Sequence, residues 1–251
     1  MSGHSKWASI KHKKGAQDAK RGKVFTKIIR EITVAAREGG GNPDINARLR
    51  SAISRAKEAN MPSDNVDKAI KKGTGELPGV TYESCMFEGY GPGGVALIAE
   101  TLTDNKNRAA AEIRNIFSKR GGNLAGSGSV AWQFVQKGYI LISKDAISEE
   151  ELFSIALDAG AEDIKSEGKN YEVFSETKDF ENVKQAIKDK NIEWELAELT
   201  MIPNATVKLA GYDAKQVLAL VEALEEHDDV QKVHANFDIP DEIMEELAAE
   251  E

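Results

Sequence analysis

The fold is decided by one segment, residues 139–202, which reads YILISKDAISEEELFSIALDAGAEDIKSEGKNYEVFSETKDFENVKQAIKDKNIEWELAELTMI. Short runs rich in β-branched and aromatic residues alternate in it with two amphipathic helical stretches. The strands and helices are expected, in order, at 139–143 (strand), 149–159 (helix), 163–166 (strand), 171–175 (strand), 180–188 (helix) and 197–202 (strand). This order predicts an inserted ferredoxin-like α/β domain over residues 137–205, with both helices on one face of a four-stranded sheet.

The sequence on either side of this segment supplies two further β-α-β units. Their strands and helices are expected at 95–102, 108–119 and 130–135, and then at 206–210, 214–225 and 230–237. The two units together predict a second ferredoxin-like α/β domain, discontinuous in the chain and formed by residues 81–136 plus 206–240. Residues 137–205 would then be inserted between its halves.

Residues 18–73 have helical periodicity. Apolar residues recur at intervals of three and four, which predicts helices over residues 18–38, 45–60 and 63–73, followed by a Gly/Pro-rich linker at 73–80. The predicted fold class is therefore α+β multidomain: an N-terminal three-helix domain followed by two ferredoxin-like α/β domains, one inserted in the other. The acidic tail, residues 241–251, is interpreted as a frayed terminal helix.

Charge is distributed very unevenly along the chain. The 251 residues include 33 Lys or Arg and 42 Asp or Glu, for a net charge of −9, but residues 1–80 carry a net +9 and the remainder a net −18. The run Glu225, Glu226, Asp228 and Asp229 is expected to be a solvated acidic surface. The sequence thus joins a basic N-terminal domain to an acidic remainder.

Composition argues against several classes of protein. A single cysteine, Cys85, excludes an intramolecular disulfide framework and a cysteine-rich zinc site, and it fits a reducing, cytoplasmic location. No run of 18 apolar residues and no signal-peptide core is present, so no membrane association is expected. The four histidines lack metal-ligand spacing, and phosphate-binding and nucleophile motifs are absent. We therefore expect no enzyme activity, metal, cofactor or small-molecule substrate.

Two glycine-rich stretches could be contact loops. GYGPGG at 89–94 formally matches a dinucleotide-binding pattern, but it precedes a predicted strand instead of following one, which favours a structural turn or a loop that serves a partner. GGNLAGSGS at 121–129 is interpreted as a helix-to-strand connection, with a flexible contact loop as the alternative.

The N-terminal basic cluster is the strongest functional signal. Residues 1–30 contain nine basic side chains and one acidic side chain. On a helix, Lys20, Lys23, Lys27 and Arg30 fall within about 80° of one another, away from Val24, Phe25, Ile29 and Ile32. Ammonium and guanidinium groups neutralise phosphates, and aromatic rings stack on bases. The candidate nucleic-acid-binding residues are Lys6, Trp7, Lys11, His12, Lys13, Lys14, Lys20, Arg21, Lys23, Lys27 and Arg30.

Other interpretations of this cluster remain open. It could be a solvated arm that aids solubility, it could contact an acidic protein partner, or it could dock on the acidic part of the same molecule. The helix also lacks a clear series of Asn, Gln and Arg base-readers, which favours contact with the nucleic-acid backbone over sequence-specific readout.

Four long motifs resemble the YebC/PmpR family of regulatory proteins across essentially the whole chain. They are GHSKWASIKHKKGAQDAKRGKVFTKIIREI (3–32), NARLRSAISRAKEANMPSDNVDKAIKKGTGE (46–76), FEGYGPGGVALIAE (87–100) and NKNRAAAEIRNIFSKRGGNLAGSGSVAWQF (105–134). The resemblance implies a helical N-terminal domain and two α/β domains around a cleft. It implies no catalytic residues.

The resemblance also implies a partner. Bacterial members are described as DNA-binding transcriptional regulators, others resemble ribosome-associated factors, and the mitochondrial branch activates translation of a cytochrome oxidase subunit. The expected partner is therefore DNA, or alternatively ribosomal RNA or tRNA on the ribosome, and the basic residues of the N-terminal motif are the positions that would bind it.

Overall fold

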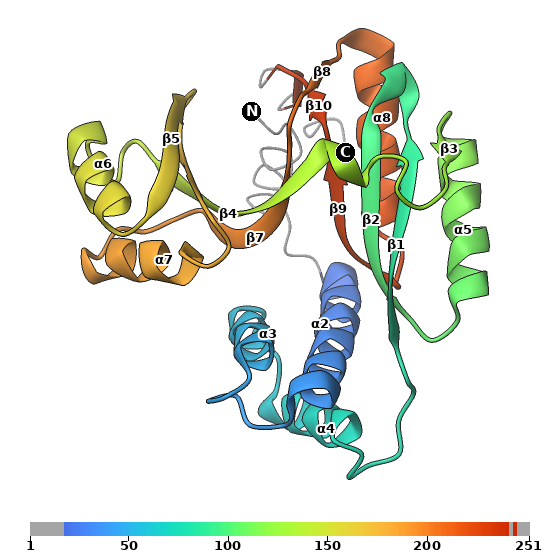
Figure 1. Ribbon diagram of the computed structural model, residues 1–251. Helices are drawn as coiled ribbons and strands as arrows, with labels where there is room; N and C mark the ends of the chain where they lie inside the picture. The colour runs from blue at the N-terminus through green and yellow to red at the C-terminus, as the bar shows by residue number, and fades with distance from the viewer. Residues whose placement is uncertain (1–17, 241–242, 245–251) are drawn as a thin grey trace.

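The computed structural model describes residues 18–240 and 243–244, which form three lobes (Figure 1). A helical lobe lies below two lobes that each contain a four-stranded sheet. Each lobe has its own buried hydrophobic cluster. None of the helices in these residues is long and apolar enough to cross a membrane.

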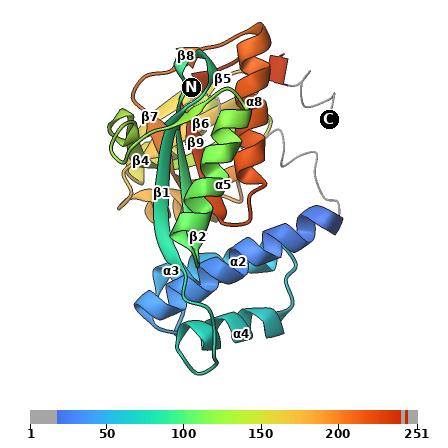
Figure 2. The same ribbon diagram turned by 90° about the vertical axis from the view of Figure 1, so that its right-hand side faces the viewer.

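The helical lobe consists of α2 (Asp18–Gly39), α3 (Ala47–Glu58) and α4 (Ser63–Gly73), with α2 packed against both of the others. Its core contains Ile28, Ile32, Leu49 and Ala56. Val24, which the periodicity assigned to the apolar face, is instead 43% exposed. One end of α2 extends beyond α3 and α4 (Figure 2).

Two local features shape this lobe. The buried side chain of Asn46 accepts a hydrogen bond from the Leu49 amide, which caps α3, and donates to the Ala35 carbonyl of α2. A Cβ at Gly73 would lie 2.4 Å from the Thr33 carbonyl oxygen, so only glycine allows α4 to approach α2 this closely.

The lobe at the left of Figure 1 has the predicted order of strands and helices. Its elements are β4 (Phe134–Ser143), α6 (Glu149–Asp158), β5 (Ala161–Glu167), β6 (Asn170–Ser175), α7 (Phe180–Asp189) and β7 (Leu196–Pro203). The sheet order is β5-β6-β4-β7 with every neighbouring pair antiparallel, as in a ferredoxin-like unit. Residues of α6 and α7 form one core with the sheet, which places both helices on the same face.

The second sheet has the order β3-β1-β2-β9, again with antiparallel neighbours. Its strands are β1 (Glu83–Tyr90), β2 (Ala96–Thr103), β3 (Asn123–Leu124) and β9 (Val230–Ala235). Helices α5 (Lys106–Lys119) and α8 (Gly211–Glu225) cover one face of this sheet and lie side by side in Figure 2.

The prediction for this second sheet is wrong in two strands. Residues 131–133 form a 3-10 turn, and the chain from Phe134 onward belongs to β4 of the other sheet. The segment expected as a strand at 206–210 contributes only β8 (Val207–Lys208), which pairs in parallel with β10 (Phe237–Asp238) outside the four-stranded sheet.

The missing strand is β1, which lies between β3 and β2 and precedes both in the chain. Its sequence ESCMFEGY has no β-branched residue and leads into a glycine-rich turn, so periodicity alone does not mark it as a strand. Consequently the chain order in this lobe is β-β-α-β followed, after the inserted segment, by α-β, and the predicted β-α-β-β-α-β order is incorrect.

Gly138 explains why two strands, 130–135 and 139–143, were predicted where the structure has the single strand β4. It lies in the middle of the strand, and a Cβ there would be 2.6 Å from Cδ2 of Phe180 in α7. The glycine therefore permits close packing of helix against strand and does not mark a turn.

The start of the acidic tail is packed. Met244 is fully buried in the core formed by α5, α8 and the second sheet, and its amide donates to the Pro240 carbonyl. The rest of residues 241–251 lies outside the described residues.

Candidate nucleic-acid interface

The predicted binding residues divide into three groups. Lys6, Trp7, Lys11, His12, Lys13 and Lys14 lie outside the described residues. Lys20 and Arg21 lie in the first turns of α2, and their side chains are likewise not described. Lys23, Lys27 and Arg30 have described side chains on one face of α2, called here the basic face.

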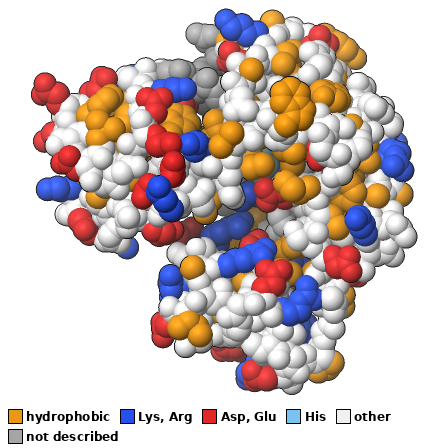
Figure 3. All heavy atoms as spheres, in the orientation of Figure 1, with side chains coloured by type: hydrophobic (Ala, Val, Ile, Leu, Met, Phe, Trp, Pro, Cys, Tyr) orange, Lys and Arg blue, Asp and Glu red, His pale blue; other side chains and the backbone are white. Residues whose placement is uncertain are grey.

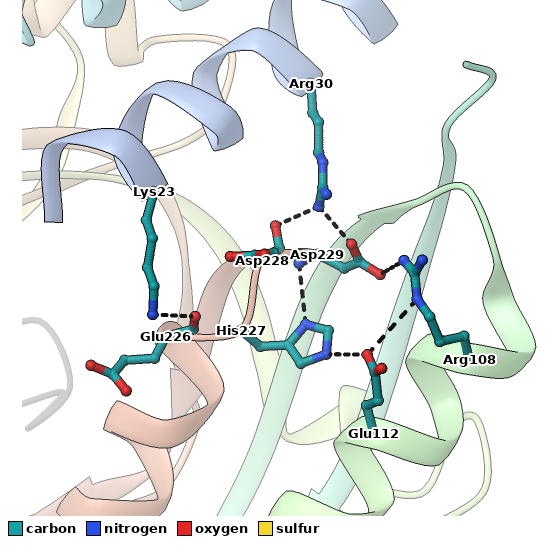
Figure 4. A pocket seen from close by; sticks show the side chains of 8 residues that line it. All are labelled: Lys23, Arg30, Arg108, Glu112, Glu226, His227, Asp228 and Asp229. Carbon is teal, nitrogen blue, oxygen red and sulfur yellow. Dashed lines mark hydrogen bonds and ion pairs between the residues drawn. The ribbon is translucent and has the colours of Figure 1, made fainter. Parts of the chain in front are cut away.

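The basic face of α2 is in contact with the acidic remainder of the same molecule. It meets residues 225–229, the acidic loop, which links α8 to β9 (Figure 4). The contacts are Lys23 Nζ to the Glu226 carbonyl (3.4 Å), Lys27 Nζ to the Glu225 carbonyl (2.6 Å), and the Arg30 guanidinium to the Asp228 carbonyl (2.5 Å) and to Asp229 Oδ1 (2.6 Å). For Lys23, Lys27 and Arg30, the structure thus agrees with one of the alternatives left open by the sequence, in which the basic cluster docks on the acidic part of the same molecule.

Asp229 is the centre of this contact. Its side chain is only 2% exposed, and it accepts hydrogen bonds from Arg30 (2.6 Å), Arg108 (2.7 Å) and Thr103 (2.8 Å). Burial raises the pKa of Asp229, but the hydrogen bonds from Arg108 and Thr103 and the positive charge of Arg30 outweigh it and hold this pKa below its usual value. Asp229 is therefore a buried anion that links α2 to α5.

His227 extends the network on the other side of the loop. Its Nδ1 accepts a hydrogen bond from the Asp229 amide (3.1 Å), and its Nε2 lies 2.9 Å from Oε2 of Glu112. Because Nδ1 is an acceptor, the neutral ring carries its proton on Nε2 and donates it to Glu112.

The resulting site is a polar cavity of about 500 Å³ between α2, α5 and the acidic loop. It is lined by Lys23, Arg30, Arg108, Glu112, Glu226, His227, Asp228 and Asp229. The positive groups face carboxylate and carbonyl oxygens, which accept their hydrogen bonds. Burial is also the largest influence on Lys27 and lowers its pKa.

The expectation of a solvated acidic surface at residues 225–229 is wrong for Asp229. Three donors from distant segments compensate for its burial, and the sequence gives no local sign of them. Arg108, Glu112 and His227 were likewise not predicted, since the contacts Arg108–Asp229 and His227–Glu112 join distant parts of the chain. The sequence signal that could have indicated this contact is the opposite net charge of residues 1–80 and of the rest of the chain.

No group of three or more His, Cys, Asp or Glu side chains in the described part of the chain could hold a metal ion. In the network around Asp229, the carboxylate is paired with the guanidinium groups of Arg30 and Arg108. The network has the chemistry of an interdomain contact.

Comparison with known proteins covers both parts of the chain. Residues 5–76 match the family model described as the TACO1/YebC protein N-terminal domain, and residues 82–237 match the model of the TACO1/YebC second and third domain. Relatives named "Probable transcriptional regulatory protein" from Syntrophobacter fumaroxidans and Dictyoglomus turgidum are 57% and 55% identical, each over 99% of this chain and 100% of the relative.

A solved structure is also similar. A conserved hypothetical protein from Aquifex aeolicus is 47% identical and superimposes with a TM-score of 0.80, covering 90% of this chain and 93% of that one.

Proposed function

This chain belongs to the TACO1/YebC family, and from this premise we propose that it is a non-enzymatic, nucleic-acid-binding regulator of gene expression. In this proposal it acts in the cytoplasm as a DNA-binding transcriptional regulator. The names of its relatives support a regulatory role in transcription. The basic N-terminal domain binds the nucleic acid.

One observation carries the proposal: nine basic residues and one acidic residue lie within the first 30 positions of a chain whose net charge is −9. Such a concentration neutralises phosphates and releases their counterions, which is the main source of affinity for a polyanion. The acidic remainder repels phosphate and orients the nucleic acid toward the N-terminal domain.

The contacts of the basic face give these nine basic residues two different roles. Lys23, Lys27 and Arg30 hold α2 on the acidic loop, so they position the N-terminal domain. The remaining basic residues bind phosphates: Lys6, Lys11, Lys13, Lys14, Lys20 and Arg21. The side chains of Trp7 and His12 stack on bases or lie along the backbone.

A ribosome-associated role on ribosomal RNA or tRNA is the second candidate. It is favoured by the composition of α2, DAKRGKVFTKIIREITVAAREG, which contains no Asn or Gln, the side chains that read adenine. Lys20 and Arg21 at the start of this helix, with the lysines that precede it, therefore contact a phosphate backbone with little regard for sequence, and this suits structured RNA as well as DNA.

Two measurements on the full chain separate the candidates. For a promoter regulator, a promoter duplex outcompetes a random duplex of equal length at fixed salt. For a ribosomal factor, the protein sediments with ribosomes at low salt and is released at high salt. A protein that binds neither duplex DNA nor ribosomes nor their RNA at any salt concentration contradicts the proposed function in both forms.

A further inference from the structure

The two glycine-rich loops meet at the end of β1. The carboxylate of Glu88 in β1 accepts hydrogen bonds from the backbone amides of Gly128 (2.6 Å), Val130 (2.7 Å) and Ala131 (2.9 Å). Glu88 is only 4% exposed. One buried carboxylate thus fixes the backbone of the loop between β3 and β4.

Two aromatic side chains are anchored on the same loop. Tyr90 Oη donates to the Ser129 carbonyl oxygen at 3.1 Å, and Trp132 Nε1 donates to the same oxygen at 3.0 Å. Tyr90 is 37% exposed and Trp132 is 72% exposed. Each ring therefore uses its polar donor inside the protein and presents ring surface to solvent. Tyr90 and Trp132 together are called here the aromatic edge.

The surroundings of the aromatic edge differ in charge from the rest of the acidic α/β part. Residues 113–134, which lead from α5 through the loop to the start of β4, include three Lys or Arg and no Asp or Glu. Pairing of Tyr90 with Asn123 brings the turn after α5 to the same end of the sheet. Lys119, the last residue of α5, and Arg120, which follows it, are exposed, and neither forms an ion pair with another described residue.

Figure 3 shows that hydrophobic side chains are exposed on the upper lobe and that Lys and Arg side chains lie at its right-hand margin. This lobe contains β1 and the start of β4 in the same orientation (Figure 1). Exposed aromatic rings with nearby cations are the features of a single-strand nucleic-acid platform.

We propose that the aromatic edge stacks on unpaired bases of a single-stranded nucleic-acid segment, while Lys119 and Arg120 contact its phosphates. The site rests on the proposed function, since it is a second contact for the same class of partner. Both hydrogen-bond donors of the aromatic edge already bind the Ser129 carbonyl oxygen, so only ring faces are left for a partner. Bases fit these faces better than a peptide does, because every base has a flat face that can stack on a ring.

The first test uses fluorescein-labelled 12-mers of oligouridylate and oligothymidylate with the full chain, and measures Kd by anisotropy at fixed salt. Trp132→Ala is expected to weaken binding about tenfold, the loss for one stacked base. Trp132→Phe keeps a ring and is expected to stay within about threefold of wild type. The matched control is Leu157→Ala, which truncates a 47% exposed side chain on α6 of the other α/β lobe.

The second test measures stacking directly. In the double variant Trp7→Phe/Trp194→Phe, Trp132 is the only tryptophan left, since the chain has three. Addition of the 12-mer is expected to quench its fluorescence with the same midpoint as the anisotropy. Binding seen by anisotropy without any quenching would overturn the proposed site.

The charge of the site is tested with Lys119→Ala/Arg120→Ala. This variant is expected to flatten the slope of log Kd against log salt by about 1.4, at about 0.7 for each phosphate contact on a single strand. Lys190→Ala, an exposed lysine after α7, is the control.

These results also separate the site from the proposed function. If Trp132→Ala and Lys119→Ala/Arg120→Ala bind like wild type while Lys11→Ala/Lys13→Ala/Lys14→Ala has lost affinity, the aromatic edge is not a contact and the N-terminal function stands. If the 12-mers do not bind the wild type while duplex DNA or ribosomal RNA does, the single-strand site is likewise overturned.

Discussion

The carboxylate of Asp229 bridges the guanidinium groups of Arg30 and Arg108, at 2.6 Å and 2.7 Å. Arg30 belongs to α2 and Arg108 to α5, so a single buried anion joins the helical lobe to the lobe of the second sheet. The Asp229 carboxylate therefore helps to hold the helical lobe against the lobe of the second sheet, together with the contacts of Lys23 and Lys27 to the acidic loop.

Asp229→Asn is expected to lower the free energy of unfolding by about 3 kcal/mol, because it leaves two guanidinium groups without their shared counter-charge. Urea denaturation followed by circular dichroism measures the change. Asp228→Asn is the matched control, since Arg30 contacts only the backbone carbonyl of Asp228. Equal stabilities of the two variants would contradict a structural role for the Asp229 carboxylate.

The contribution of Asp229 depends on pH in a defined direction. Its folded pKa is lower than its unfolded value of about 3.9, so its stabilisation is fully present above that value and is lost as the pH falls through the folded pKa. The difference in unfolding free energy between wild type and Asp229→Asn should be constant from about pH 6 to 8 and shrink below about pH 4. A difference that grows in acid would refute this assignment.

Glu88→Gln is expected to loosen the loop between β3 and β4. Burial raises the pKa of Glu88, but three backbone N–H donors hold it below the ordinary value, so the native group is a carboxylate that accepts three hydrogen bonds. Glutamine keeps one acceptor oxygen and adds donors that face other donors, at a cost of about 2 kcal/mol.

Hydrogen exchange at the Gly128, Val130 and Ala131 amides measures this effect, and faster exchange is expected for all three. Glu83→Gln, an exposed substitution on the same strand, should leave these rates unchanged. If Glu88→Gln protects these amides as well as wild type does, the carboxylate does not organise the loop.

Much of the fold could be predicted from periodicity. The helices of the N-terminal lobe and the strands and helices of residues 137–205 have clear apolar spacing, because each buries one face against one core. The prediction was wrong where packing against distant segments decides the structure. Gly138 separates two predicted strands but lies inside β4 against Phe180, and β1 has a carboxylate at Glu88 whose hydrogen bonds come from the loop from Gly128 to Ala131.

The candidate site was predicted in part. The concentration of positive charge at the N-terminus and the basic face of α2 follow from residue spacing alone. That the basic face meets the acidic loop does not follow, because the contact joins residues about 200 positions apart. The exposure of Trp132 also depends on the tertiary course of the loop and has no local sequence signal.

The measurement that tests the central claim most directly is the salt dependence of nucleic-acid binding by Lys11→Ala/Lys13→Ala/Lys14→Ala. The matched control is Lys169→Ala/Lys188→Ala/Lys190→Ala, which removes the same charge from exposed positions of the 137–205 lobe. If residues 6–21 bind phosphates, the slope of log affinity against log salt should become shallower by about 2.7 on duplex DNA, or about 2.1 on a single strand, and the control should keep the wild-type slope. Equal slopes for the wild type and both triple variants would contradict the account.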